Sequence, residues 1–364
     1  MERPTSTMEN MGKIIMKTFY KNKKILITGH TGFKGSWLVK ILDNWDSDIT
    51  GYSLKPPTKP NLYDTLEADV NNITADIRDY DKLLSVFKDI EPEIVIHMAA
   101  QPLVLEGYKN PQETYQTNVM GTVNICEAIK NTDTVKSFIN ITTDKVYQND
   151  DTDKKYKEND KLNGYDPYSN SKSCSDIITQ SYYKSFYRDA GISTSTIRSG
   201  NVIGGGDFAK DRIIPDCIKA ALKQKTIQIR NPNSIRPYQH VLEPLNIYLK
   251  IAKEQYKKQE YSSTYNIGPD EKDCINTKTL VELFCKYWGE NQNYEILDTN
   301  GPHEAKYLKL DSSKIKEKFN WTPRWNVEKA IEKTVEWAKA YQKNTNTNTI
   351  LNAQIEEFFK KKIG

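Results

Sequence analysis

The sequence of 364 residues has little cysteine, no long apolar run and no basic block. Its five cysteines are an odd number without C-x-x-C spacing, which argues against a disulfide framework and a structural zinc site and indicates a reducing compartment. No apolar stretch is long enough to cross a membrane, and residues 1–20 lack the apolar core of a signal peptide. The 52 basic and 48 acidic residues leave a dispersed net charge of +4. We therefore expect a cytoplasmic protein without a metal, a membrane or a nucleic acid as partner.

Three glycines at a spacing of three, Gly29, Gly32 and Gly35, directly follow the apolar run Ile25–Thr28. This pattern predicts a buried strand that ends in a glycine-rich turn and opens a helix. Gly29 permits the tight turn, Gly32 lets the backbone approach a pyrophosphate, and Gly35 lets the helix lie close to its strand. The N–H groups at the start of the helix would then face the phosphates. The segment predicts a dinucleotide site; the alternative is a glycine-rich turn without a ligand.

Strand-like and helix-like segments alternate through the first 200 residues, which predicts an α/β fold with a doubly wound parallel (Rossmann) sheet. Past Asn201 the alternation is lost, which favours a smaller C-terminal substrate-binding lobe over the sheet's carboxyl edge. We expect a disordered lead-in at 1–20, the dinucleotide-binding domain at 21–200, the substrate lobe mainly at 201–340, and a linker with a C-terminal helix at 341–364. The expected elements are strands at 24–28, 49–53, 94–97, 137–142 and 193–198, and helices at 35–44, 80–88, 111–130 and 168–190.

Tyr168 and Lys172 stand four residues apart on an expected helix and therefore share a face. An ammonium beside a phenol stabilises the phenolate, so Tyr168 could accept a proton from a substrate hydroxyl. Such pairs also occur by chance on many helices. The position of this pair, after Thr142–Lys145 at the end of the preceding strand, favours a role in a cofactor cleft.

These motifs together resemble the extended short-chain dehydrogenase/reductase family of nucleotide-sugar enzymes and, more narrowly, the CDP-glucose branch of its 4,6-dehydratases. The resemblance runs from about residue 23 to 330. It is carried by the segments 28–37 (TGHTGFKGSW), 51–60 (GYSLKPPTKP), 97–104 (HMAAQPLV), 117–122 (TNVMGT), 142–145 (TTDK), 164–172 (GYDPYSNSK), 200–207 (GNVIGGGD), 212–216 (RIIPD), 229–245 (IRNPNSIRPYQHVLEPL) and 302–311 (PHEAKYLKLD).

The resemblance implies an NAD-dependent hydro-lyase acting on a nucleotide-hexose such as CDP-glucose. Tyr168 with Lys172 would take the O4 proton during oxidation at C4, and Thr143 would hydrogen-bond near O4. Asp144 would protonate the leaving C6 hydroxyl and Lys145 would remove the C5 proton, with exchanged roles left open. A neutral Lys145 amine requires burial or a cationic neighbour such as Lys172.

The resemblance also implies ligand contacts. Cofactor contacts fall on Thr28, Gly29, Gly32, Phe33, Lys34, Gly35, Asp76, Ile77, Ala99, Ala100, Gln101, Thr117, Tyr168 and Lys172. Substrate contacts fall on Gln101, Thr143, Asn201, Arg212, Arg236, Asn266 and Tyr307, with Arg230, His240 and His303 as weaker candidates.

Two departures stand beside these contacts. The strand at 49–53 leads into Leu54–Lys55 without the carboxylate that NAD folds usually place there, and Lys55 could accept a 2′-phosphate. Leu105–Glu106 stands where the resemblance implies arginine, which would alter specificity if that arginine touches a ligand.

Two other functions fit parts of the pattern. A nucleotide-sugar 4-epimerase shares the Tyr–Lys pair but has no use for an acid–base pair at C5 and C6, and a dinucleotide-sensing regulator would be expected to lose Tyr168. The helices at 111–130 and 168–190 carry apolar residues on more than one stripe, which predicts a homodimer or a higher oligomer through a four-helix interface. These residues are Val119, Val123, Ile125 and Ile129 on the first helix, and Ile177, Ile178, Tyr182, Tyr183 and Phe186 on the second.

Overall fold

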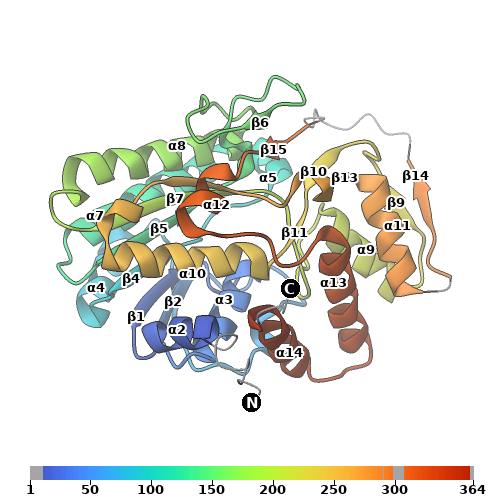
Figure 1. The fold of residues 1–364 in the computed structure, drawn as a ribbon, viewed down its shortest axis with the longest axis horizontal. Helices are drawn as coiled ribbons and strands as arrows, with labels where there is room; N and C mark the ends of the chain where they lie inside the picture. Colours follow the sequence, from blue (N-terminus) through green and yellow to red (C-terminus); the bar gives the residue numbers. More distant parts are fainter. Residues whose placement is uncertain (1–10, 290, 298–306, 361–364) are drawn as a thin grey trace, which may run out of the picture.

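A computed structural model describes residues 11–289, 291–297 and 307–360, and its centre is a seven-stranded sheet of order β12-β7-β5-β4-β1-β2-β3. Every neighbouring pair in this sheet is parallel, which confirms the expected doubly wound fold (Figure 1). The strands are β1 (Lys24–Thr28), β2 (Asp48–Ser53), β3 (Asn71–Thr74), β4 (Ile94–His97), β5 (Ser137–Ile141), β7 (Ser193–Ser199) and β12 (Thr264–Ile267).

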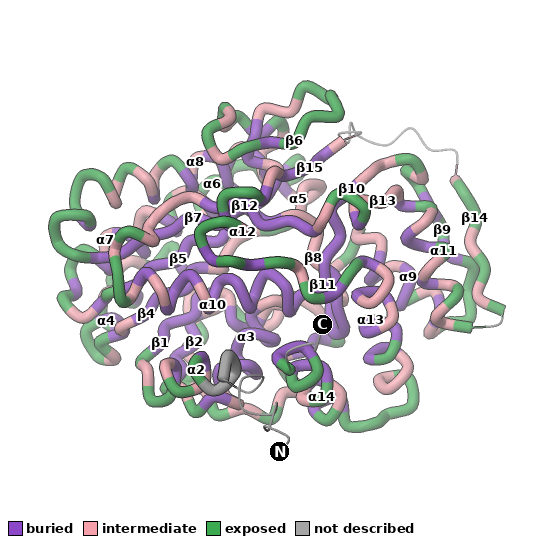
Figure 2. The backbone as a smooth tube through the Cα atoms, in the orientation of Figure 1, coloured by how far each residue is buried: buried purple, intermediate pink, exposed green. Residues whose placement is uncertain are grey.

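Alternate side chains of the central strands pack into two separate cores. Ile25 and Ile27 of β1 face one core, which also contains Trp37 of α3, while Leu26 faces the other, which contains Phe87 of α4. This alternation follows from the two-residue period of a strand and lets helices cover both faces. Helices α3 (Phe33–Asp43) and α10 (Leu242–Lys257) cover the first face, and α4 (Tyr80–Ile90) and α7 (Gly121–Lys130) cover the second, with α8 (Pro167–Tyr182) beside α7. Figure 2 shows α10 buried along most of its length.

Both long helices that the sequence predicts contain a π-helical turn. The first runs through α6 (Pro111–Tyr115), the π turn η2 (Gln116–Met120) and α7, and the second continues from α8 into the π turn η4 (Tyr183–Tyr187). Single π turns often lie at functional sites. Here η2 carries the buried Asn118, whose amide group binds the backbone of Gln101.

Residues 11–20 are the helix α2 (Met11–Tyr20), so the expected disorder of residues 1–20 is wrong for this part; residues 1–10 lie outside the described residues. Tyr20 is fully buried and its hydroxyl donates to the carbonyl of Leu249 on α10 (2.6 Å), while Met16 packs into the first core. The segment folds because these side chains find partners 229 residues away along the chain, which local composition does not reveal.

The expected division at residue 200 does not coincide with the sheet. Strand β12 pairs with β7, and α10 covers the sheet, although both lie within 201–340. The smaller lobe, at the right in Figure 1, is built around the helices α9 (Ile213–Leu222), α11 (Thr277–Trp288) and α13 (Val327–Gln342). The C-terminal helix α14 (Thr347–Phe359) packs on α3 and α13.

Short elements complete the described fold. Its two-stranded sheets are β10·β13, β11·β8, β14·β9 and β15·β6, and no helix in the described ranges is both long and apolar enough to cross a membrane. The bounds are β6 (Lys155–Tyr156), β8 (Val202–Ile203), β9 (Ile227–Ile229), β10 (Ile235–Pro237), β11 (Gln239–His240), β13 (Cys274–Asn276), β14 (Tyr294–Ile296), β15 (Lys309–Leu310), α5 (Val104–Lys109), α12 (Ser313–Phe319), and the 3-10 turns η1 (Tyr63–Thr65), η3 (Asp144–Val146), η5 (Gln259–Tyr261) and η6 (Glu271–Asp273).

Candidate active site

The turn between β1 and α3 has the close geometry that the three glycines predict. Gly29 has a φ of +75°, and a Cβ there would lie 2.7 Å from the backbone nitrogen of Ala99. A Cβ at Gly35 would collide with the carbonyl of Gly29, whereas one at Gly32 would lie 3.4 Å from it. Gly32 caps α3 without a side-chain hydrogen bond, so the first N–H groups of the helix have no intrahelical partner and suit an anionic group.

The side chain of Thr28 makes its hydrogen bonds within the protein. It is fully buried, and its Oγ1 lies 2.7 Å from Nδ1 of His97 and accepts from the backbone N–H groups of Met98 and Ala99 at 3.2 Å. The hydroxyl of Thr28 therefore fixes the 98–101 loop, and the cofactor contact expected at this residue stays a prediction. Burial, and secondarily Lys172, lowers the pKa of His97 to about 3, so its imidazole is neutral.

The 98–101 loop leaves β4 at the carboxyl edge of the sheet, where ligands bind in doubly wound folds. Ala99, Ala100 and Gln101 are partly exposed there. The amide of Gln101 donates to Oγ1 of Thr114 (2.9 Å) and accepts from the backbone N–H of Leu103 (2.6 Å), so it shapes its own loop. Thr117 lies half-buried on η2, next to Asn118.

The predicted adenine-side residues lie at the end of β3. Asp76 forms a two-pronged ion pair with Arg78 (2.6 Å for the shortest contact), which lowers the pKa of the carboxyl group. Ile77 packs against Gly121, and a Cβ at Gly121 would lie 2.7 Å from the Ile77 side chain. The carbonyl of Ile77 accepts from the amide of Asn124 (3.0 Å). The end of β2 carries no carboxylate: Ser53 binds Thr31 (2.8 Å), and Lys55 is exposed.

Tyr168 and Lys172 lie on the first turns of α8, as predicted. The helix begins there because Asp166 caps it by accepting from the N–H of Ser169 (3.0 Å) and Pro167 occupies its first position. Burial raises the pKa of Tyr168 above its usual value, against the opposing effects of the Lys145 charge, a hydrogen bond with Thr143 and the Arg212 charge. Burial, followed by the charge of Lys34, lowers the pKa of Lys172 to about 7.

The sequence predicts that Lys172 lowers the pKa of Tyr168, and this physical reason is wrong. Lys145 and Arg212 are the cations that act on the phenol, and desolvation outweighs them. Lys172 is 3% exposed and makes no hydrogen bond or ion pair within the described part of the chain. Whether Lys172 carries a proton therefore depends on the ligand that occupies the cleft.

The segment Thr143–Lys145 turns sharply after β5 into η3. The hydroxyl of Thr143 donates to Oδ1 of Asp144 (3.0 Å), and Nζ of Lys145 lies 3.0 Å from the same oxygen. Asp144 is fully buried, and its Oδ2 has no hydrogen-bond partner among the described residues. The structure thus gathers Thr143, Asp144, Lys145 and Tyr168, as the sequence predicts.

Lys34 is a cation that the sequence places at the pyrophosphate. It is half-buried on the first turn of α3 and makes no hydrogen bond or ion pair with any described residue. Burial, then the charge of Arg212, lowers its pKa to about 8, while Asp144 and Asp207 oppose this. Lys34 is therefore within electrostatic reach of Arg212 and Asp144.

Among the residues predicted to contact substrate, Asn201 lies near Lys145 and Arg212 lies near Tyr168. Oδ1 of Asn201 lies 3.5 Å from Nζ of Lys145, and Nη1 of Arg212 donates to Asp207 (3.2 Å) while the side chain stays 37% exposed. Arg236 is 3% exposed, and its Nη1 donates to the carbonyl of Ile235 (2.9 Å). Tyr307 is half-buried at the boundary of the described residues, with its carbonyl bound by Asn149 (2.9 Å); His303 lies outside them.

Asn266, for which the sequence predicts a substrate contact, has its side chain bonded within the protein. Asn266 is fully buried, its Oδ1 accepts from the hydroxyl of Tyr147 (2.6 Å), and its Nδ2 donates to the carbonyl of Tyr156 (2.8 Å). The residue sits on β12, which the sequence does not place in the sheet, so its burial could not be foreseen.

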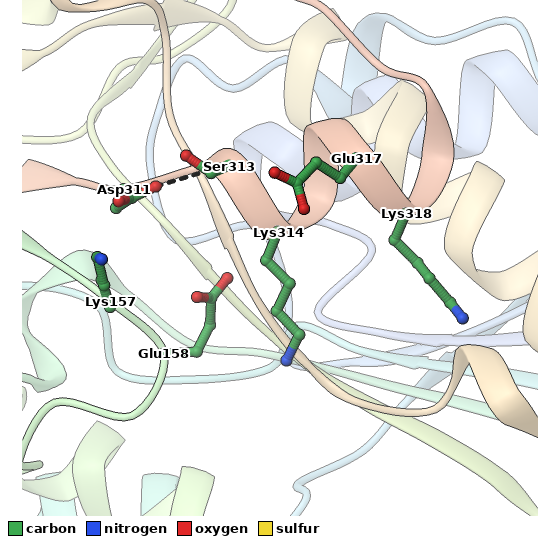
Figure 3. Close-up of a pocket in the computed structure, with 7 residues that line it drawn as sticks. All are labelled: Lys157, Glu158, Asp311, Ser313, Lys314, Glu317 and Lys318. Atoms are coloured by element: carbon green, nitrogen blue, oxygen red, sulfur yellow. Dashed lines mark hydrogen bonds between the residues drawn. The ribbon is translucent and has the colours of Figure 1, made fainter.

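Two further residues named from the sequence have partners within the protein. His240 is fully buried between Trp37 and Trp325, and Glu106 binds Asn110. The pocket drawn in Figure 3 lies between the Lys157–Glu158 segment and α12 and contains none of the predicted site residues. Among the described residues, no cluster of histidine, cysteine and carboxylate side chains could hold a metal ion.

Comparison with known proteins places this geometry in a family. Residues 26–334 match the family model described as GDP-mannose 4,6 dehydratase. The chain is 40% identical to the CDP-glucose 4,6-dehydratase of Salmonella typhimurium, over 90% of this chain and 94% of the relative, and 28% identical to the dTDP-glucose 4,6-dehydratase of Shigella flexneri, over 89% and 94%.

A similar fold occurs in the solved dTDP-glucose 4,6-dehydratase of Bacillus anthracis in complex with NAD (TM-score 0.73, 23% identity, covering 90% of this chain and 99% of that one). The family model and the Salmonella relative each cover most of the chain, and both describe nucleotide-sugar 4,6-dehydratases. The chain therefore belongs to the nucleotide-sugar 4,6-dehydratases of the extended short-chain dehydrogenase/reductase family.

Proposed function

We propose that the protein converts CDP-glucose to CDP-4-keto-6-deoxyglucose and water. The observation that carries the proposal is that Tyr168, with Thr143 in hydrogen-bond reach, meets the Asp144–Lys145 ion pair at the carboxyl edge of the sheet. The choice of CDP-glucose is supported by the 40% identity to the Salmonella enzyme of that name.

The site residues fit NAD. The turn between Gly29 and Gly35 leaves no room for side chains where its backbone comes close, and the uncapped start of α3 with Lys34 suits a pyrophosphate. When bound there, NAD would supply the acceptor for the C4 hydride and the source of the hydride for C6, which would make the overall reaction redox-neutral. Because no carboxylate ends β2, selection of NAD over NADP does not depend on an acid at that position.

Tyr168 acts first, by accepting the proton of the O4 hydroxyl. Thr143, which lies within hydrogen-bond reach of Tyr168, helps to hold that hydroxyl. Because burial raises the pKa of the phenol, the positive charges of Lys145 and Arg212 are needed to stabilise the phenolate.

Asp144 and Lys145 then serve elimination across C5 and C6. As an ion pair they hold one proton between them, and transfer of that proton from the ammonium to the carboxylate gives a carboxylic acid and a neutral amine. The amine of Lys145 removes the C5 proton, and Asp144 protonates the leaving C6 hydroxyl, which departs as water.

Assembly as a homodimer in a reducing cytoplasm completes the proposal. The helices α6–η2–α7 and α8–η4 expose Tyr115 (36%), Met120 (50%), Ile177 (51%) and Phe186 (45%). Ile125 and Ile129 of the predicted stripes instead belong to the core. All five cysteines are free and lie in the described residues, which suits a reducing compartment.

The direct test incubates the purified protein with CDP-, dTDP-, UDP- and GDP-hexoses. In alkali a 4-keto-6-deoxy sugar absorbs in the near ultraviolet, whereas an epimerised sugar does not. We expect this absorbance with CDP-glucose above all other substrates. Epimerisation without dehydration, or dehydration of another nucleotide sugar at a higher kcat/KM, would contradict the proposal.

A further inference from the structure

A buried ion pair lies directly behind the catalytic helix face. Asp176 follows Lys172 by four residues and Tyr168 by eight on α8, so the three side chains share one face. Arg198 of β7 binds both oxygens of Asp176, with Nε 2.7 Å from Oδ2 and Nη2 2.9 Å from Oδ1. The side chains are 1% and 0% exposed, so this is a two-pronged pair removed from water.

Asp176 also binds the strand that carries the acid–base turn. Oγ1 of Thr142, the residue before Thr143, is 3.3 Å from Oδ2 of Asp176 and 3.1 Å from the carbonyl of Ile197 on β7. Gln180 donates to Oδ1 from the next turn of α8 (2.6 Å). One carboxylate therefore connects α8, β5 and β7 at the level of the site.

Arg198 extends the connection beyond the turn. Its Nη1 donates to the hydroxyl of Tyr147 (2.8 Å) and to the carbonyl of Glu158 (2.9 Å), and its guanidinium lies 4.9 Å from the ring centroid of Tyr147. Since Tyr147 directly follows η3, the segment that carries Asp144 and Lys145 is fixed at both ends: through Thr142 before it and through Tyr147 after it.

A buried ion pair is a poor source of stability, because the loss of hydration offsets the attraction between the charges. Its geometric effect is stronger, since a two-pronged contact fixes both distance and orientation. The cleft needs such control because Tyr168 and Lys172 lie on one element while Asp144 and Lys145 lie on another, and small misplacements of reacting groups reduce rates strongly.

We propose that Asp176 and Arg198 are positioning residues, which hold the Tyr168–Lys172 face of α8 at a fixed distance from the Thr143–Lys145 turn. The inference rests on the dehydratase activity but not on the identity of the nucleotide. It predicts that loosening the pair lowers kcat and leaves the KM for the nucleotide sugar nearly unchanged, because both side chains are buried within the protein.

The test uses Arg198→Lys, which keeps the buried positive charge but cannot form the two-pronged contact, and Thr142→Val, which removes only a hydroxyl. With whichever nucleotide-hexose the wild type dehydrates best, we expect kcat to fall at least tenfold in Arg198→Lys and severalfold in Thr142→Val, with KM and NAD affinity within twofold. Thr142→Ser restores the hydroxyl and should restore kcat. Lys23→Met is the matched control, since it breaks the ion pair to Glu93 (2.8 Å) at the amino edge of the sheet.

Unchanged kcat in both Arg198→Lys and Thr142→Val overturns the inference. It is also overturned if Lys23→Met and Arg198→Lys have the same thermal stability and lose the same amount of kcat. If Arg198→Lys does not fold, the Thr142→Val and Thr142→Ser pair decides alone. A wild type that dehydrates another nucleotide sugar contradicts the proposed substrate while leaving this test intact. A wild type that only epimerises contradicts the proposed function. In that case kcat and KM for epimerisation are compared between the wild type and the same variants.

Discussion

The ammonium of Lys145 lies 3.0 Å from Oδ1 of Asp144, and the second oxygen of that carboxylate is buried without a partner in the described chain. The two residues are adjacent in sequence, and their side chains meet because η3 turns the backbone directly after Thr143. A single proton shared by the pair could therefore supply both an acid and a base, as the proposed elimination requires.

Replacement of Tyr168 by phenylalanine removes only the phenolic oxygen. We expect a folded protein with normal NAD affinity and a rate lowered at least about a hundredfold, the range for loss of a general base. Steady-state kinetics with a dinucleotide-binding titration measures both. Tyr115→Phe, which loses a surface hydroxyl bound to Asn170 (3.1 Å), serves as the control, and turnover near that of the wild type in Tyr168→Phe would remove the phenol from the mechanism.

Replacement of Lys145 by alanine should block the step after oxidation. Oxidation itself should be slower, because Lys145 is one of the charges that stabilise the Tyr168 phenolate. Since the C5 proton then stays, reduced nicotinamide should still accumulate in a single turnover followed by its absorbance. Lys145→Ala also leaves Asp144 without its cation, so Asp144→Asn with Lys145→Ala tests whether the effect belongs to the amine. A variant that neither oxidises the sugar nor stalls after oxidation would give Lys145 a structural role.

The charge of Lys34 should make ligand affinity depend on pH. Burial and Arg212 lower its pKa to about 8, so the ammonium is present at pH 7 and mostly lost at pH 9. Binding of the anionic dinucleotide, measured by calorimetry, should weaken over this range, and Lys34→Met should bind about tenfold more weakly at pH 7, an effect of about 1.4 kcal/mol, with a flatter pH profile. An exposed-lysine control is Lys88→Met. Equal pH profiles for Lys34→Met and the wild type would exclude this role.

His240 should weaken the fold in acid. Its pKa is lowered to about 3 by burial and secondarily by Lys333, whereas an unfolded chain has a value near 6.5. Between these values the unfolded state binds the additional proton, so the free energy of unfolding falls as pH falls, by up to about 1.4 kcal/mol per pH unit.

Chemical denaturation at pH 4.5 and pH 6 measures this contribution. In His240→Asn the free energy of unfolding should change less steeply with pH, because one proton fewer is taken up on unfolding. The loss of contacts with Trp37 and Trp325 lowers stability at every pH. Burial raises the pKa of Glu243 to about 7, so this residue changes the free energy of unfolding with pH in the opposite direction. Because Glu243 is present in both the wild type and His240→Asn, the difference between their two pH slopes isolates the contribution of His240. An unchanged slope would mean that His240 titrates in the folded state.

The exposed apolar residues of α6–η2 and α8–η4 should be covered by a second copy. Sedimentation at micromolar concentration should give at least twice the chain mass of 42.0 kDa. Ile177→Glu together with Met120→Glu places charges on this face and should give monomers, whereas the same changes on the exposed Leu54 and Ile296 should not. An active wild-type monomer would contradict the dimer.

The fold and the central catalytic groups were accessible from the sequence because their patterns are local. A glycine spacing, an apolar run or a Tyr–Lys pair four residues apart fixes geometry within a few residues. The hydrogen-bond partners of Thr28 and Asn266 were not accessible, since each lies far along the chain: His97 for Thr28 and Tyr147 for Asn266. Helix α2 and strand β12 were missed for the same reason. The spacing of Asp176, four residues after Lys172, was a visible pattern that could have indicated the buried pair with Arg198.

The pairing of β12 with β7 also limits how this chain can be divided. A fragment ending near residue 200 would leave β7 with an open edge of unpaired N–H and C=O groups, a surface that invites association between chains. It would also lack α10 and the carbonyl of Leu249 that receives Tyr20. The segments of the smaller lobe are thus inserted into one cooperative folding unit. A chimaera that takes these segments from a relative must keep residues 242–267 of the recipient protein. A cut at residue 200 would produce two incomplete pieces.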